Sequence, residues 1–307
     1  MSSKYDVIKV KVRLNDKHYY VLSRFFLSKM LTFCRVSEDI ALRMSLDIKK
    51  HFVKTERTSI TQAELVDYVR CAMVSAGLSQ EHAQLFSVVT EFHTERIPLI
   101  LFIIGPEHCG KTTLAQLLGA RLNCNTVINV EVLRDISASI DESLSPSTVS
   151  CTSSSCQTSA MLQGVEVAVA VEAEVDKAVR EGRVVIIEGE NLPFSSFQRF
   201  LDPSYQISTG AVILGVLMEA CSSEEQQGVS QAYAKDVPNL EPVLSTEHVS
   251  VFAAVPESLA NSVSGIPTVY VARCTAVVEN VRLSVFLHDV IVSRISADLQ
   301  RRGRITR

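Results

Sequence analysis

The stretch Gly105-Pro106-Glu107-His108-Cys109-Gly110-Lys111-Thr112 combines residue types and spacing that are suited to binding phosphate. It fits the Walker A pattern G-x-x-x-x-G-K-[ST], in which glycines let the backbone curl until successive amides point inward. In that pattern the Lys111 ammonium reaches the β- and γ-phosphates, and the Thr112 hydroxyl holds Mg²⁺. The sequence therefore predicts an ATP and Mg²⁺ site whose phosphate cradle runs from Gly105 to Thr113.

The middle of this loop has two unusual residues. Glu107 brings a negative charge near the phosphate path, so it either lowers the affinity for phosphate or points outward. Cys109 is either an inert filler of the loop or a thiol whose pKa the loop amides lower, which would make it oxidisable.

The segments around the loop have the patterns that such a site needs. Residues 97–104 form a continuous apolar run, which is typical of a buried parallel strand. Residues 111–122 have helical spacing, and a helix that begins there adds the positive end of its dipole to the phosphate site.

Strand and helix patterns then alternate along the chain. Further strands are expected over residues 126–130, 183–187, 211–218 and 268–271, with helices over 164–180 and 277–301. This alternation predicts an α/β domain over residues 97–307, with a doubly wound, mostly parallel sheet of the P-loop kinase type. The serine-rich segment 137–159 favours a mobile loop, with a substrate loop that closes over the phosphates as the alternative.

The region before residue 97 has a different organisation. Alternating residues 5–14 and the segment 18–21 predict two strands, followed by helical patterns over 25–33 and 40–52. Thr61, with Glu64 three residues later, is a helix-capping signal, and helices are expected over 61–76 and 79–92. We interpret residues 1–56 as a small α+β module and residues 57–96 as a helical connector.

Composition limits the classes of partner. The 307-residue chain has a net charge of −4, which argues against a nucleic-acid coat. Its apolar runs are too short to cross a membrane and its start lacks a signal peptide, so we expect a cytoplasmic location, with import into an organelle left open. None of the 8 cysteines forms a Cys-x-x-Cys pair, and we expect reduced thiols.

Beyond the loop, the chain resembles the 2-phosphoglycerate kinase-like P-loop proteins, in their plant and protist form with an N-terminal ATP-cone-like module. The resemblance rests on motifs spread over most of the chain. They are Val12-Arg13-Leu14-Asn15-Asp16-Lys17-His18-Tyr19-Tyr20, Ser23-Arg24-Phe25-Phe26-Leu27-Ser28-Lys29, Leu31-Thr32-Phe33, Arg96-Ile97-Pro98-Leu99, Val185-Ile186-Ile187-Glu188-Gly189 and Glu279-Asn280-Val281-Arg282.

The resemblance implies transfer of the γ-phosphoryl group of ATP, with Mg²⁺, to a small phosphorylated or polyol acceptor. It implies that Glu188, with Thr112 and Glu131, holds the Mg²⁺ shell, or that Glu188 accepts the acceptor's proton. Arg134 would bind the acceptor's phosphate, and Arg282 would reach the transferring phosphate or brace the last helix. The ordinary alternatives are a solvent-facing carboxylate and surface arginines.

Three features depart from the family pattern. Glu131 stands in place of an aspartate, Asn191 in place of a histidine, and residues 200–272 contain no arginine. In that span Lys235 and His248 are accompanied by Glu219, Glu224 and Glu225, whereas small-molecule kinases close a basic lid over the phosphates. The alternative function is therefore a catalytically weak nucleotide-binding component of a larger assembly, in which a partner supplies the missing basic residue. The N-terminal module either binds a regulatory nucleotide or only packs.

Overall fold

The computed structural model describes residues 7–144, 153–190, 192, 194–218, 262–263, 266–272 and 277–304. Contacts divide the chain into two units. One unit comprises Met1–Glu95, Arg121–Asn123 and Leu299–Arg307, and the other comprises Arg96–Ala120 and Cys124–Asp298.

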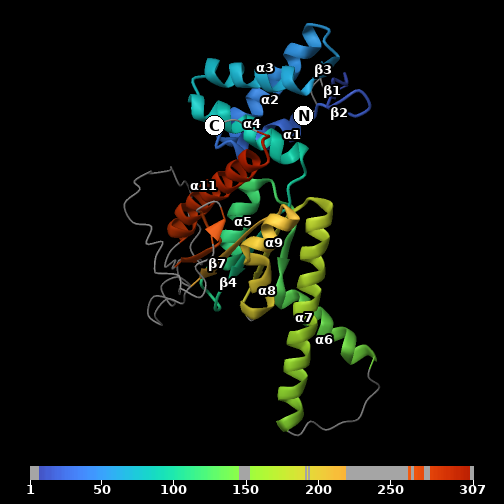
Figure 1. The fold of residues 1–307 in the computed structure, drawn as a ribbon, viewed down its shortest axis with the longest axis vertical. Helices are drawn as coiled ribbons and strands as arrows, with labels where there is room; N and C mark the ends of the chain where they lie inside the picture. The colour runs from blue at the N-terminus through green and yellow to red at the C-terminus, as the bar shows by residue number, and fades with distance from the viewer. Residues whose placement is uncertain are drawn as a thin grey trace. The chain divides into compact units, whose positions relative to one another are not determined.

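The second unit is built on a five-stranded sheet with the order β10-β7-β4-β6-β5, in which every strand pairs in parallel (Figure 1). The five strands are β4 (Leu99–Ile104), β5 (Val127–Asn129), β6 (Val184–Gly189), β7 (Val212–Met218) and β10 (Val269–Ala272). All of β4 is buried, as its continuous apolar run predicts. The predicted parallel α/β sheet is therefore confirmed.

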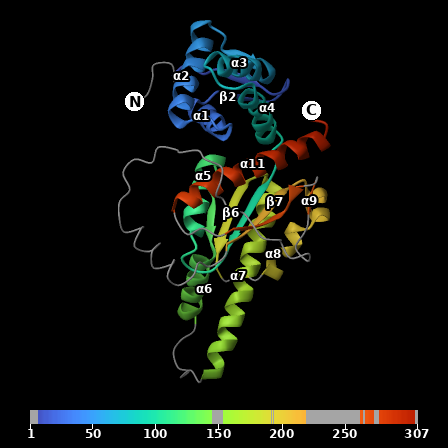
Figure 2. The same ribbon diagram turned by 90° about the vertical axis from the view of Figure 1, so that its left-hand side faces the viewer.

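Helices cover both faces of this sheet (Figures 1 and 2). Phe102 and Ile187 point to the face packed by α7 (Ser153–Glu181) and α8 (Phe194–Leu201). The opposite face is packed by α5 (Lys111–Leu122), whose Gly119 lies against Ile186, and by α11 (Val277–Arg301), whose Phe286 ring contacts Tyr270. This layering is that of a P-loop kinase α/β fold.

The connection from β5 to β6 differs from the prediction. The mobile loop expected over residues 137–159 is wrong for 137–144 and 153–159, because α6 (Val130–Leu144) and α7 are helical there. Serine costs only a few tenths of a kcal/mol relative to alanine within a helix, and the spacing of Ile136, Ile140 and Leu144 continues the helical pattern. The alternative of a closing substrate loop stays a prediction.

Several short elements were not predicted from the sequence. They are the helix α9 (Pro203–Thr209), the helix α8, and a two-stranded antiparallel sheet of β8 (Ser262–Val263) and β9 (Ile266–Pro267). Each is too short to give a clear periodic pattern.

The first unit has a three-stranded sheet in the order β2-β1-β3, with β1 (Lys11–Arg13), β2 (Tyr19–Val21) and β3 (Ser59–Thr61). Its helices are α1 (Arg24–Phe33), α2 (Glu38–Lys54), α3 (Gln62–Ser75) and α4 (Gln80–Thr94). The predicted hairpin and four helices are confirmed, whereas β3, which pairs in parallel with β1, was not predicted. The division into a module of residues 1–56 and a connector of 57–96 stays a prediction.

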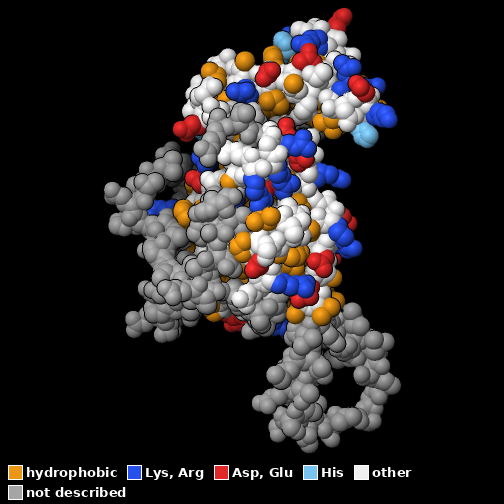
Figure 3. Space-filling model, in the orientation of Figure 1, with side chains coloured by type: hydrophobic (Ala, Val, Ile, Leu, Met, Phe, Trp, Pro, Cys, Tyr) orange, Lys and Arg blue, Asp and Glu red, His pale blue; other side chains and the backbone are white. Residues whose placement is uncertain are grey.

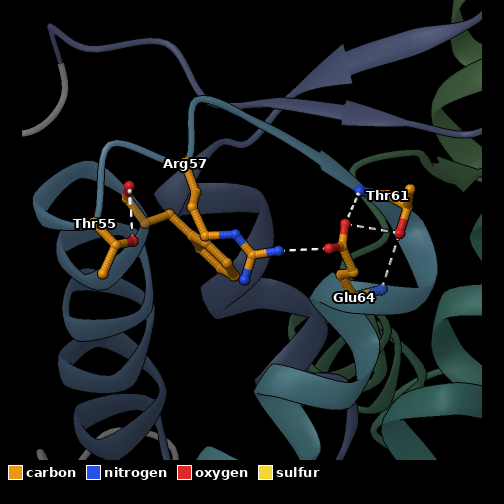
Figure 4. A network of polar contacts seen from close by, with 5 residues as sticks. Thr55, Arg57, Thr61 and Glu64 are labelled. Atoms are coloured by element: carbon orange, nitrogen blue, oxygen red, sulfur yellow. Dashed lines mark hydrogen bonds and ion pairs between the residues drawn. The ribbon is translucent and has the colours of Figure 1, made fainter.

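The predicted cap at Thr61 is a full capping box (Figure 4). The Thr61 hydroxyl accepts a hydrogen bond from the backbone N–H of Glu64, and the Glu64 carboxylate accepts one from the backbone N–H of Thr61. The backbone N–H of Thr61 and, next in size, its hydroxyl lower the pKa of Glu64 by donating to the carboxylate, with a smaller contribution from the Arg57 guanidinium paired with it. The box stabilises the start of α3 next to β3.

Candidate functional site

The phosphate loop follows β4 directly and needs both of its glycines. A Cβ atom on Gly105 would lie 2.4 Å from the carbonyl oxygen of Met218, so only glycine fits between β4 and the end of β7. The Gly105 N–H donates to the carbonyl of Gly189 at 3.2 Å, which ties the loop to the end of β6. Gly110 has φ +86°, a left-handed conformation that glycine adopts without strain.

Lys111 lies across this loop. Its Nζ donates to the carbonyl of Pro106 at 2.6 Å, so the ammonium reaches over the concave side of residues 105–110. Thr112 follows on the first turn of α5 and is exposed, while Thr113 is half-buried. The curled backbone, the cation and the hydroxyl are thus arranged around one helix N-terminus, which favours anions.

Two residues of the loop were given alternative interpretations from the sequence. Glu107 is exposed, and its Oε2 lies 3.9 Å from Nε2 of the exposed His108. The carboxylate of Glu107 therefore lies on the solvent side of the loop. Cys109 is buried, with 2% of its surface exposed, and its thiol donates to the carbonyl of Pro106 at 3.0 Å. Both observations favour the simpler interpretations, an outward-pointing Glu107 and a packing role for Cys109.

Glu188 lies at the carboxyl end of β6, beside the strand that leads into the loop. It is aligned with Ile103 of β4 and with Asn129 of β5. Its side chain is 2% exposed, and its Oε1 accepts a hydrogen bond from Asn129 Nδ2 at 3.1 Å. Its Oε2 is buried and has no hydrogen-bond partner among the residues that the structure describes. A buried carboxylate oxygen without a donor favours a cation or water ligand.

Glu131 reaches the same edge of the sheet from α6. Its Oε1 accepts a hydrogen bond from the backbone N–H of Glu190, and it would lie 3.3 Å from a Cβ on Gly189. The start of α6 and the end of β6 approach closely, because that Cβ would also lie 2.6 Å from Val130 Cβ. Glu131 and Glu188 therefore both lie at the carboxyl end of β6, where Glu131 contacts Gly189 and Glu190 while Glu188 faces the opposite side of the strand from Gly189.

The two predicted arginines are less directly placed. Arg134 is half-buried on α6, three residues after Glu131 and so on a similar face, and Arg282 is half-buried on α11. Within the described part of the chain, neither guanidinium forms a hydrogen bond with the carboxylate of Glu188. Asn191, Lys235, His248 and the glutamates at 219, 224 and 225 lie outside the described residues.

Asn129 and Asn280 are two site residues to which no role was assigned from the sequence, although Asn280 stands in the motif Glu279-Asn280-Val281-Arg282. Asn129 Oδ1 accepts from the backbone N–H of Val132 at 2.9 Å, so this residue caps α6 while it holds Glu188. Asn280 of α11 packs on Gly110, since its Nδ2 would lie 2.5 Å from a Cβ there. An asparagine before a helical pattern is a cap signal that reveals Asn129, but no local signal reveals Asn280.

The described residues form neither a ready-made metal cluster nor a membrane-spanning helix. They contain no group of three or more His, Cys, Asp or Glu side chains placed to hold a metal ion. A Mg²⁺ bound through phosphates, water and one or two carboxylates does not need such a group. None of the described helices is long and apolar enough to span a bilayer.

Surface charge does not form a single basic face in the view of Figure 3. Lysine and arginine side chains are interspersed with aspartate and glutamate over the described surface on that side. This mixture agrees with the net charge of −4.

Comparison with known proteins finds archaeal 2-phosphoglycerate kinases. Identity is 27% to the Pyrococcus horikoshii protein over 58% of this chain and 63% of that one. It is 27% to the Pyrococcus furiosus protein over 61% and 65%, and 24% to the Methanopyrus kandleri protein over 59% of each. The chain is a distant relative of these kinases. The matches span less than two thirds of the length of the curated relatives. No family model matches the chain, and no solved structure does.

Proposed function

We propose that the protein binds ATP and Mg²⁺ and transfers the γ-phosphoryl group to a small phosphorylated or polyol acceptor, as 2-phosphoglycerate kinases do. The observation that carries the proposal is the position of Lys111 on a curled glycine loop, next to the strand end that holds Glu188 and its unpaired Oε2. The distant relationship to archaeal kinases supports the same chemistry.

Binding of the phosphates would use the loop and the start of α5. Backbone N–H groups between Glu107 and Thr113 would donate to phosphate oxygens, whereas Pro106 has no N–H and the Gly105 N–H donates to Gly189. The Lys111 ammonium would leave the Pro106 carbonyl to pair with the β- and γ-phosphates. Because phosphoryl transfer needs positioning and charge stabilisation more than covalent help, this cradle supplies a large part of the catalysis.

The residues at the strand ends fit a magnesium ion. Thr112 offers an exposed hydroxyl, and Glu188 offers a buried oxygen without a donor. Glu131, which accepts a hydrogen bond from the Glu190 N–H just after β6, would complete the set through water. Mg²⁺ neutralises charge on the β- and γ-oxygens when it is bound. The alternative role for Glu188 is to accept the acceptor's proton as a general base.

Arg134 and Arg282 are the proposed cations for the remaining charge. A half-buried guanidinium on α6, three residues from Glu131, fits an acceptor phosphate through bidentate hydrogen bonds. Arg282, half-buried on α11, would reach the transferring phosphate or brace that helix. These roles remain proposals for each residue.

For the first unit we propose an ATP-cone-like module of the plant and protist form, over residues 1–56 with a connector to 96. Its support is the order of hairpin and helices, β1-β2-α1-α2, in the stretch that carries the resemblance. Whether it binds a second nucleotide is answered by counting ATP equivalents bound at saturation, where a ratio of two supports a regulatory site.

Phosphate transfer from γ-labelled ATP to a panel of acceptors, including 2-phosphoglycerate and glycerate, tests the function. Wild type should label one acceptor, Lys111→Ala should not, and the exposed Lys177→Ala should behave as wild type. Lys111-dependent ATP binding with no labelled product would instead favour the nucleotide-binding component of an assembly. Transfer that survives in Lys111→Ala would contradict both functions.

A further inference from the structure

Asn280 belongs to α11, yet its carboxamide lies directly on the phosphate loop. An atom at the Cβ position of Gly110 would lie 2.5 Å from Asn280 Nδ2 and 3.2 Å from its Oδ1. The carboxamide therefore occupies the volume that a side chain at Gly110 would fill. Gly110 precedes Lys111 directly, so this contact is made at the residue that orients the lysine and its amide.

Packing of α11 fixes the position of this side chain. Asn280 is 2% exposed, and Leu283, Leu287, Ile291 and Ile295 on the same helix are also buried. Ser284, one turn further on, is also buried and donates from its hydroxyl to the carbonyl of Val281. Asn280 is thus presented to the loop by a rigid, well-packed element.

The contact is made at a position with unusual backbone freedom. Glycine at φ +86° has no Cβ to limit its conformation, and an unrestrained glycine can leave the left-handed region readily. Gly110 also accepts the first backbone hydrogen bond of α5, from Leu114 N–H at 3.0 Å. A side chain pressed on its Cα restrains both the loop amides and the start of the helix.

Asn280 is a polar residue at a buried position, where an apolar side chain would avoid the free-energy cost of burying an unpaired polar atom. Its Oδ1 is buried without a hydrogen-bond partner among the described residues, and such a group costs about 1–3 kcal/mol. Unpaired buried polar atoms of this kind concentrate at functional sites.

We propose that Asn280 is a positioning residue for the phosphate loop: it holds Gly110 in the curled conformation and thereby sets the affinity for a polyphosphate chain. The proposal rests on the nucleotide site of the proposed function and adds a determinant that acts on the phosphates, irrespective of the nucleoside. It predicts equal effects on ATP and on inorganic tripolyphosphate.

The test compares Asn280→Ala and Asn280→Ser with Ser284→Ala, which removes a buried hydroxyl one turn away on the same helix. Dissociation constants for Mg-ATP and Mg-tripolyphosphate are measured by calorimetry, and thermal midpoints are measured without ligand. Asn280→Ala should weaken both ligands by the same factor, about ten-fold, which corresponds to about 1.4 kcal/mol. Asn280→Ser should weaken both less, and Ser284→Ala should change neither affinity by more than about two-fold.

Thermal midpoints separate positioning from general damage. Ser284→Ala, which removes a hydrogen-bonded hydroxyl, should lower the midpoint at least as much as Asn280→Ala, which removes an unpaired buried oxygen, while only Asn280→Ala changes affinity. Loss of ATP affinity with unchanged tripolyphosphate affinity would overturn the proposal, because Asn280 would then contact the nucleoside. Wild-type affinity in both Asn280 variants, with binding lost in Lys111→Ala, would overturn it too and leave the proposed function standing. If the wild-type protein binds neither Mg-ATP nor Mg-tripolyphosphate, the proposed role of Asn280 and the proposed function are both wrong.

Discussion

Asn129 Nδ2 donates to Glu188 Oε1 at 3.1 Å, while Asn129 Oδ1 accepts from the backbone N–H of Val132 at 2.9 Å. The Asn129 side-chain carboxamide therefore caps the N-terminus of α6 and also orients the buried Glu188 carboxylate at the end of β6. The two functions use different atoms of the same side chain, and substitution can separate them.

Asn129→Ser retains a hydroxyl that can cap α6 but loses the donor to Glu188, and Asn129→Ala loses both. Both variants should reduce phosphate transfer similarly, because each leaves Glu188 without its orienting bond. The alanine variant should be less stable than the serine variant by about 1 kcal/mol, the usual value of a helix cap. Urea unfolding and labelled transfer measure the two effects. Wild-type transfer in Asn129→Ser would contradict the role of the Glu188 contact.

Gly110→Ala should impair the protein far more than Gly77→Ala. Both glycines have positive φ, +86° and +83°, so each alanine pays about 1–2 kcal/mol for the left-handed backbone. A Cβ on Gly77 meets nothing within 4 Å, whereas one on Gly110 collides with Asn280. Nucleotide affinity should fall only in Gly110→Ala. Equal loss of stability and unchanged affinity in the two variants would argue against the tight contact.

His93 predicts an acid-dependent loss of stability in the first unit. Burial among Phe26, Phe33 and Phe92 lowers the pKa of His93 from 6.5 to about 4. The unfolded chain binds a proton that the folded chain excludes, so stability is full above pH 6.5 and falls as the pH drops toward 4. The loss amounts to about 3 kcal/mol.

His93→Phe provides the comparison for this effect, because it keeps a ring in the aromatic cluster and removes the titration. Unfolding free energies from urea titrations between pH 7 and pH 4 should show a flatter profile for the variant than for wild type. Parallel profiles would show that His93 does not titrate in this window.

Thr61→Ala should destabilise the first unit by about 1 kcal/mol, since it removes the hydroxyl that accepts from the Glu64 N–H. The exposed Thr58→Ala, outside the capping box, is the matched control and should be nearly neutral. Thermal unfolding followed by circular dichroism measures both. A neutral Thr61→Ala would mean that the box adds nothing to α3 beyond what packing provides.

The sequence predicted the features that depend on neighbouring residues. The phosphate loop, the buried strand β4 and the cap at Thr61 each follow from a short stretch with its own pattern. The closing helix over 277–301 was also predicted with its bounds, because its apolar spacing is regular.

What the sequence did not predict depends on packing between distant segments. Asn280 meets Gly110 only because α11 lies against the sheet, and no spacing rule connects the two positions. Ser59–Thr61 is too short for a strand pattern and is held by pairing with β1. Asn129 had a local cap signal, but its position at the end of an apolar run favoured interpretation as part of a strand.

Calorimetric binding of Mg-ATP to wild type and to Lys111→Ala tests the central claim most directly. Lys111 spans the loop to Pro106 at 2.6 Å and would move to the β- and γ-phosphates. Wild type should bind Mg-ATP, and the variant should bind it at least about ten-fold more weakly with an unchanged thermal midpoint. Absence of binding to wild type, or equal binding by both proteins, would contradict the assignment of residues 105–113 as a nucleotide site.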